Sequence, residues 1–151
     1  MDGWRVWGEL RRRPHIELAW ALLTGHRGRI EDLGGGRRRI TIEARLGRVD
    51  RRAVLAHELV HDERSILFSD STPPALVVKE EAYVIAETTR RLVPQAALVP
   101  LVQRVVDDGG CVEWTDVAEW FDVPRDVAER ALRAVVSSSW GAGTGFGQPT
   151  F

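Results

Sequence analysis

The segment HELVH at residues 57–61 constrains the fold of this chain more than any other feature of its sequence. It has the form H-E-x-x-H, and its two histidines can bind one metal ion only if they lie one turn apart on the same face of a helix. Apolar residues recur at helical spacing around it, including Val54, Leu55 and Leu59. We therefore predict a helix over residues 50–66.

The chemistry of this motif points to zinc. His57 and His61 supply two imidazole ligands on one helix face. Glu58 is rotated by about 100° around the helix from its neighbour His57, so it does not bind the metal at the same position as the histidines. It is placed instead to act as a general base on a metal-bound water. Zinc also requires a third protein ligand and a fourth position open to water. We expect the third ligand on a second helix packed beside the first.

Two adjacent acidic residues, Glu80 and Glu81, are candidates for this third ligand. Both lie near the start of a helix predicted over residues 75–92, which follows a loop at residues 69–74. An acidic pair at this position is equally consistent with a solvated pair that offsets the helix dipole. The residue types alone therefore leave both candidates open.

Three strands are predicted before the motif helix. Apolar residues alternate over residues 16–22, and turns containing glycine separate this segment from the segments 29–33 and 37–46. We interpret the three as an antiparallel sheet packed on the metal-binding helices, which makes the fold class α+β. Strand 37–46 is expected at an edge, where it could pair with an extended peptide.

Helices are also predicted at the two ends of this unit. A short helix over residues 4–13 precedes the sheet, and a small C-terminal helical bundle follows over residues 94–136. The predicted organisation is a metallopeptidase core over residues 1–93, a helical subdomain over 94–136 and a disordered tail over 137–151, which is rich in Gly and Ser.

Composition excludes several classes of protein. The chain has 21 basic and 22 acidic residues, for a net charge of −1. This balance argues against a protein whose main function is to bind and wrap nucleic acid. The single cysteine cannot form an internal disulfide. No signal peptide and no apolar stretch of about 20 residues is present, so we expect a cytoplasmic protein that does not contact a membrane.

Two segments of the chain resemble the ImmA/IrrE family of metallopeptidases. They are LAHELVH at residues 55–61 and EEAYVIAETTRRLVP at residues 80–94. The resemblance extends over about residues 37–136. It implies a zincin-like fold with a bound zinc ion and peptidase activity.

The resemblance favours Glu81 as the third zinc ligand. Glu81 lies thirteen residues before Pro94, which is the ligand position of the family, and Glu80 remains the competing candidate. Ile85 departs from the family pattern, in which Asn or Asp is usual. Tyr83, the only tyrosine, is expected to point away from the metal when Glu81 is the ligand.

The family resemblance also implies a substrate. It suggests cleavage of a helix-turn-helix transcriptional repressor of a phage or mobile element, in the cytoplasm of the host cell if the protein is phage-encoded. The alternative is a non-hydrolytic, metal-stabilised regulator that binds a repressor or DNA. The sequence of residues 115–136 predicts two helices joined by a turn, as in a helix–turn–helix motif. Acidic residues on the second helix argue against DNA contact.

Overall fold

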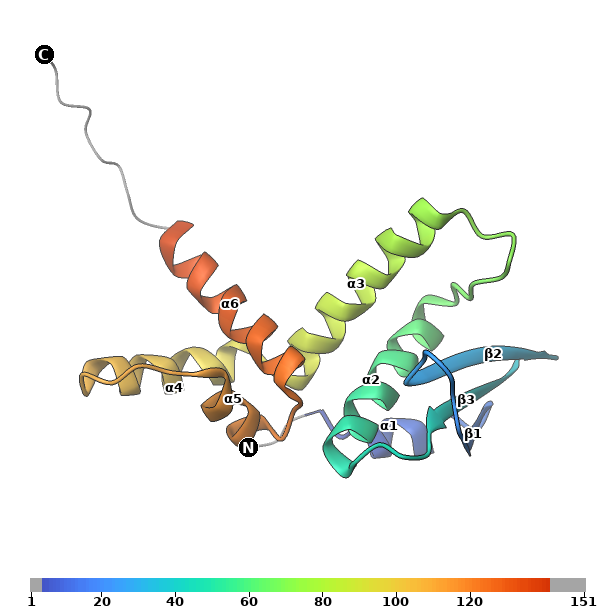
Figure 1. Ribbon diagram of the computed structural model, residues 1–151, viewed down its shortest axis with the longest axis horizontal. Coiled ribbons are helices and arrows are strands. Elements are labelled where there is room, and N and C mark those ends of the chain that lie inside the picture. The colour runs from blue at the N-terminus through green and yellow to red at the C-terminus, as the bar shows by residue number, and fades with distance from the viewer. Residues whose placement is uncertain (1–3, 142–151) are drawn as a thin grey trace, which may run out of the picture.

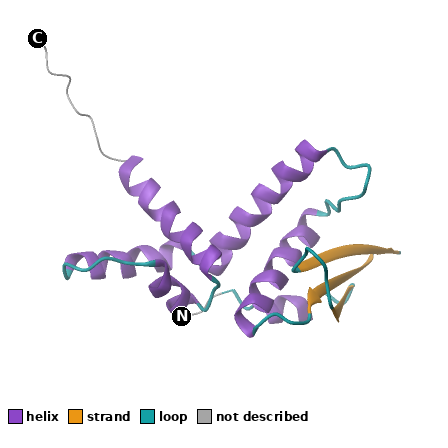
Figure 2. Cartoon of the chain, in the orientation of Figure 1, coloured by secondary structure: helices purple, strands orange, loops and turns teal. Residues whose placement is uncertain are grey.

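Residues 4–141 of the computed structural model form an α+β fold (Figure 1). Figure 2 shows the strands gathered at one end of the molecule and the C-terminal helices at the other. The elements in chain order are α1 (Val6–Arg11), β1 (Ile16–Ala21), β2 (Gly28–Gly34), β3 (Arg37–Glu43), α2 (Arg48–Arg64), α3 (Pro74–Leu92), α4 (Gln95–Asp107), α5 (Trp114–Phe121) and α6 (Arg125–Gly141).

The sheet is mixed, so the prediction of an antiparallel sheet was wrong. Its strand order is β1-β3-β2, with β1 parallel to β3 and β2 antiparallel to β3. Strand 37–46, expected at an edge, is therefore the central strand. Ile40 and Ile42 of β3 are fully buried, and β3 is the most buried of the three strands because it has a neighbouring strand on each side.

A tight glycine turn makes the β2–β3 hairpin. Gly35 and Gly36 connect the two strands with φ values of 62° and 76°, a backbone conformation that favours glycine at both central positions of a hairpin turn. No such turn joins β1 to β2, and β1 pairs on the far side of β3. Alternation of apolar residues is the same in parallel and antiparallel strands, so the sequence carried no signal for this difference.

Helix α2 forms the middle layer between the sheet and α3 (Figure 1). Leu55 and Leu59 are fully buried beneath the sheet and neighbouring helices. The helix begins at Arg48 and ends at Arg64, where Ser65 adopts a left-handed conformation with φ of 55°. The predicted helix over residues 50–66 is thus present, with its ends shifted by two residues.

The C-terminal helices share the apolar core of the rest of the chain. Val117 of α5 and Ala128 of α6 are fully buried in a cluster that also contains Leu55. Helix α5 begins with a capping box, in which the Asp116 carboxylate accepts a hydrogen bond from the Glu113 amide at 2.8 Å.

Helix α6 runs five residues further than predicted. Residues 137–141 were expected in a disordered tail but are helical, and the hydroxyl groups of Ser137 and Ser138 donate to carbonyls four residues earlier. The rest of the expected tail, residues 142–151, lies outside the described residues. Within residues 4–141, no helix is long and apolar enough to cross a membrane.

Candidate metal centre

Three side chains from two helices converge on one point. His57 and His61 lie one turn apart on α2, and Glu81 faces them from α3. The two histidine Nε2 atoms are 3.2 Å apart. The Glu81 carboxylate reaches both rings, with Oε1 2.9 Å from His61 Nε2 and Oε2 3.3 Å from His57 Nε2. The structure therefore brings together three groups that could hold a metal ion.

The spacing and chemistry of these atoms fit zinc. Ligand atoms at tetrahedral angles and zinc bond lengths lie roughly 3.3 Å from one another. With one ligand atom taken from each of His57, His61 and Glu81, the three atoms lie within 4.8 Å of one another, and the two Nε2 atoms are 3.2 Å apart. Two imidazole nitrogens and one carboxylate are also a common zinc ligand set. Hydrogen bonds from His57 and His61 lower the pKa of Glu81 to about 2, so this carboxylate is ionised at neutral pH.

The neighbouring Glu80 is engaged elsewhere. Its side chain is buried and accepts hydrogen bonds from Nε and Nη2 of Arg64, the second at 2.9 Å. The Arg64 guanidinium also lies over the Tyr83 ring, 3.8 Å from its centroid. Adjacent residues point about 100° apart on a helix, so the pairing of Glu80 with Arg64 leaves Glu81 directed at the two histidines.

Glu58 is buried beside the ligand group. Its side chain is only 6% exposed, and this burial raises its pKa, an effect partly offset by His57 and His61. Gly28, the first residue of β2, packs directly against Glu58. A Cβ added at Gly28 would lie 3.1 Å from Glu58 Oε1 and 2.4 Å from a methyl carbon of Val54. Only glycine allows this strand to lie so close to the carboxylate.

The sequence analysis missed two residues at this site. Gly28 lay in a segment read as a turn, and nothing in the local sequence indicates that it packs against Glu58. Phe68, in the loop between α2 and α3, packs its ring edge-on against His61 with centroids 5.7 Å apart. Phe68 closes a short apolar run with Ile66 and Leu67 in this loop, and that run was the only available signal for the contact.

A second charged cluster surrounds Asp62, the residue after His61. Its buried carboxylate accepts hydrogen bonds from Nη1 of Arg13 at 3.1 Å and Nη1 of Arg38 at 2.8 Å. His15 Nε2 lies 3.0 Å from the same carboxylate. This cluster joins α2 to β3 and to the segment before β1.

Comparison of the chain with protein-family models, with curated proteins and with solved structures finds no match.

Proposed function

We propose that this chain is a zinc-dependent metallopeptidase that cleaves a peptide bond in another protein. The observation that carries the proposal is the convergence of His57, His61 and Glu81 beside the buried carboxylate of Glu58. Two histidines and a glutamate are the protein ligands of several hydrolytic zinc sites. When bound, zinc would supply a Lewis acid that lowers the pKa of water and polarises the scissile carbonyl.

In this proposal Glu58 transfers the proton. Its carboxylate accepts a proton from the attacking water and donates it to the departing amine. Glu58 lies outside the three-residue ligand group although it neighbours His57 in sequence. A metal site with a purely structural role has no need of a buried carboxylate at this position, which favours hydrolysis over the non-hydrolytic alternative.

Strand β2 is the best candidate for binding an extended substrate. Within residues 4–141 it pairs with β3 on one side only, so its other edge is open to strand addition. Its first residue, Gly28, lies against Glu58, so a peptide paired with β2 would pass close to the general base. This assigns to β2 the substrate-binding role that the sequence analysis gave to strand 37–46.

The proposed substrate is a helix-turn-helix repressor of a phage or mobile element. This step rests on the resemblance of residues 55–61 and 80–94 to the ImmA/IrrE family, as does the proposed zincin-like fold and cytoplasmic location. The rival proposal is a metal-stabilised module that binds a repressor without cutting it. The buried position of Glu58 beside the ligand group argues for cleavage.

The substitution Glu58→Gln separates these two proposals. It keeps the volume of the side chain but removes the base, so we expect zinc content and thermal stability to be retained while cleavage falls by a factor of about 100 or more. Cleavage is measured by mass spectrometry on a candidate helix-turn-helix repressor, and zinc by elemental analysis. Glu119→Gln, which removes an exposed carboxylate from α5, is the matched control and should cleave normally.

Relief of repression in cells gives the decisive comparison. If Glu58→Gln relieves repression as well as the unmodified protein does, hydrolysis is not the mechanism and the binding module replaces it. If purified protein binds no zinc, the proposed metal centre is wrong.

A further inference from the structure

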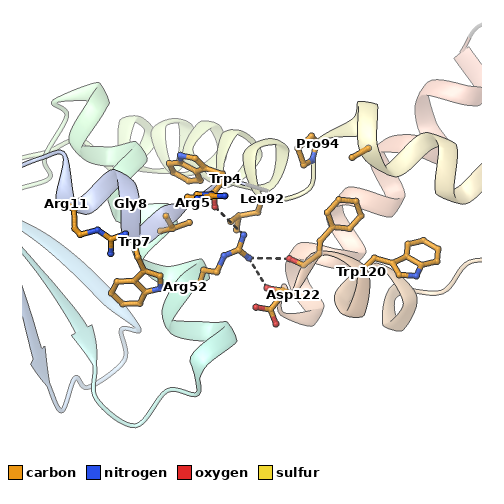
Figure 3. Close-up of a pocket in the computed structure, with 13 residues that line it drawn as sticks. Trp4, Arg5, Trp7, Gly8, Arg11, Arg52, Leu92, Pro94, Trp120 and Asp122 are labelled. Carbon is orange, nitrogen blue, oxygen red and sulfur yellow. Dashed lines mark hydrogen bonds between the residues drawn. The ribbon is translucent and has the colours of Figure 1, made fainter. Parts of the chain in front are cut away.

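A groove of about 560 Å³ lies between α1 and α5, formed by residues distinct from the candidate metal centre (Figure 3). Aromatic side chains form much of its lining, namely those of Trp4, Trp7, Trp120 and Phe121. Figure 3 shows Arg52 of α2 in the middle, between the two sides of the groove. Grooves of this size between parts of a chain, with aromatic walls and charged groups that can orient a ligand, are typical of small-molecule sites.

Arg52 is a half-buried cation whose side-chain hydrogen bonds within residues 4–141 go to backbone carbonyls. Its guanidinium donates hydrogen bonds to backbone carbonyls of Asp122 at 2.9 Å, Phe121 at 3.3 Å and Trp4 at 3.4 Å. No carboxylate of residues 4–141 lies within 4.0 Å of it, and burial lowers its pKa. These three bonds use only part of the donor capacity of a guanidinium, which has five N–H groups.

The charge of the Asp122 carboxylate acts on Arg52, and the same carboxylate is paired with Arg48. The Asp122 carboxylate accepts two hydrogen bonds from Arg48, at 2.5 and 2.7 Å. Arg5 and Arg11 of the α1 region also line the groove, and the exposed Arg11 forms no ion pair with the part of the chain that the structure describes. The lining therefore includes the cations of Arg11 and Arg52 and the Asp122 carboxylate, which is hydrogen-bonded to Arg48.

We propose that this groove binds a small aromatic anion, a molecule with a carboxylate, sulfonate or phosphate on a planar apolar body. The hydrogen bonds of Arg52 within residues 4–141 go to backbone carbonyls, so an anionic group placed beside it would gain charge-assisted hydrogen bonds from its remaining N–H groups. The tryptophan walls offer flat surfaces on which an aromatic body can stack. The binding site is independent of the proposed peptidase activity.

Fluorescence titration with two dyes tests the charge requirement. Anilinonaphthalene sulfonate carries an anionic group, whereas phenylnaphthylamine has the same aromatic body without it. We expect one sulfonate dye to bind per chain, with an affinity at least about tenfold higher than that of the neutral dye. Equal affinity for the two dyes, or no binding of the sulfonate, would overturn the proposal.

Charge reversal locates the dye in the groove. Arg11→Glu should weaken binding of the sulfonate dye by about tenfold, while Arg133→Glu, the same change at an exposed arginine of α6, should leave it unaltered. Arg52→Gln should weaken binding further, although Arg52 joins three segments and this variant requires a circular dichroism check of its fold. Arg11→Glu decides the question if Arg52→Gln does not fold. Equal losses in Arg11→Glu and Arg133→Glu would contradict a site in the groove.

Competition identifies the anion. Displacement of the dye by naphthoate or by naphthyl phosphate supports the proposal and shows which anionic group the groove prefers. Displacement by neither overturns it.

Discussion

Two clusters of charged side chains extend from the same end of α2, and they are built in opposite ways. Around Asp62, one buried carboxylate meets the guanidinium groups of Arg13 and Arg38 and the ring of His15. Around His61, two imidazoles and one carboxylate face one another and no guanidinium belongs to the group. The first cluster is a closed ion-pair network, and the second is a group of atoms that could hold a metal ion.

The closed network continues across the helices. Arg13 also contacts Glu63, Glu63 accepts hydrogen bonds from Arg91 at 2.6 and 2.8 Å, and Arg91 donates to Glu87 at 2.6 Å. Each carboxylate in this chain of contacts is used by an arginine, so none is free to bind a metal. The cation closest in sequence to His61, Arg64, is paired with Glu80 instead. Arginine side chains therefore link the helices through ion pairs, and no arginine belongs to the group of His57, His61 and Glu81.

The largest effect should come from breaking the closed network. Asp62→Ala leaves Arg13 and Arg38, with side chains only 13% and 18% exposed, without their shared carboxylate. We expect the free energy of unfolding to fall by about 3 kcal/mol in urea titrations. Asp70→Ala, in an exposed loop, is the control and should change it by less than about 0.5 kcal/mol. A loss below 1 kcal/mol for Asp62→Ala would show that the network contributes little.

The next test compares the two adjacent glutamates. Glu81→Gln should lower zinc affinity by a factor of about 100 or more, because it removes a ligand charge. Glu80→Gln removes the charged hydrogen bonds between Arg64 and the Glu80 carboxylate. It should lower zinc affinity by less than about tenfold. Competition with a chromophoric chelator measures both. The reverse order would transfer the ligand role to Glu80 and contradict the contrast between the two clusters.

A smaller effect is expected at Gly28. The added methyl group of Gly28→Ala would lie 2.4 Å from a Val54 methyl carbon and 3.1 Å from Glu58 Oε1, so β2 must shift. We expect a loss of stability of about 2 kcal/mol together with reduced peptidase activity. Gly47→Ala has open space around the new atom and a φ of −71°, and should be neutral or slightly stabilising. Equal behaviour of the two variants would mean that β2 does not pack tightly over Glu58.

The smallest effect concerns the outer end of the network and depends on pH. Hydrogen bonds from Arg90 and Arg91 lower the pKa of Glu87 from 4.5 to about 2. A lowered folded-state pKa stabilises the protein above pH 4.5, and this contribution is lost as the pH falls toward 2. Glu87→Gln should therefore cost less than about 1 kcal/mol at pH 7. Its difference from the unmodified protein should shrink between pH 4.5 and 2 in thermal melts, and a difference independent of pH would contradict this origin.

The sequence predicted the parts of the site that depend on local spacing. The i, i+4 positions of His57 and His61 place both rings on one face of any helix, and the apolar residues of α2 show where that helix lies. The helix bearing Glu80 and Glu81 follows from the same periodicity. These features need only the geometry of a single helix, so they could be found without knowledge of the packing.

The packing of these helices and strands against one another could be known only from the tertiary structure. The pairing of Glu80 with Arg64, which leaves Glu81 facing the histidines, depends on how α3 is rotated against α2. The parallel pairing of β1 with β3 and the close approach of Gly28 to Glu58 also join residues far apart in the chain. Hydrophobic alternation identifies the buried face of a strand but is identical for both strand directions. Strand order and the packing partners of each side chain depend on how much apolar surface the whole core buries. A local sequence pattern does not contain that information.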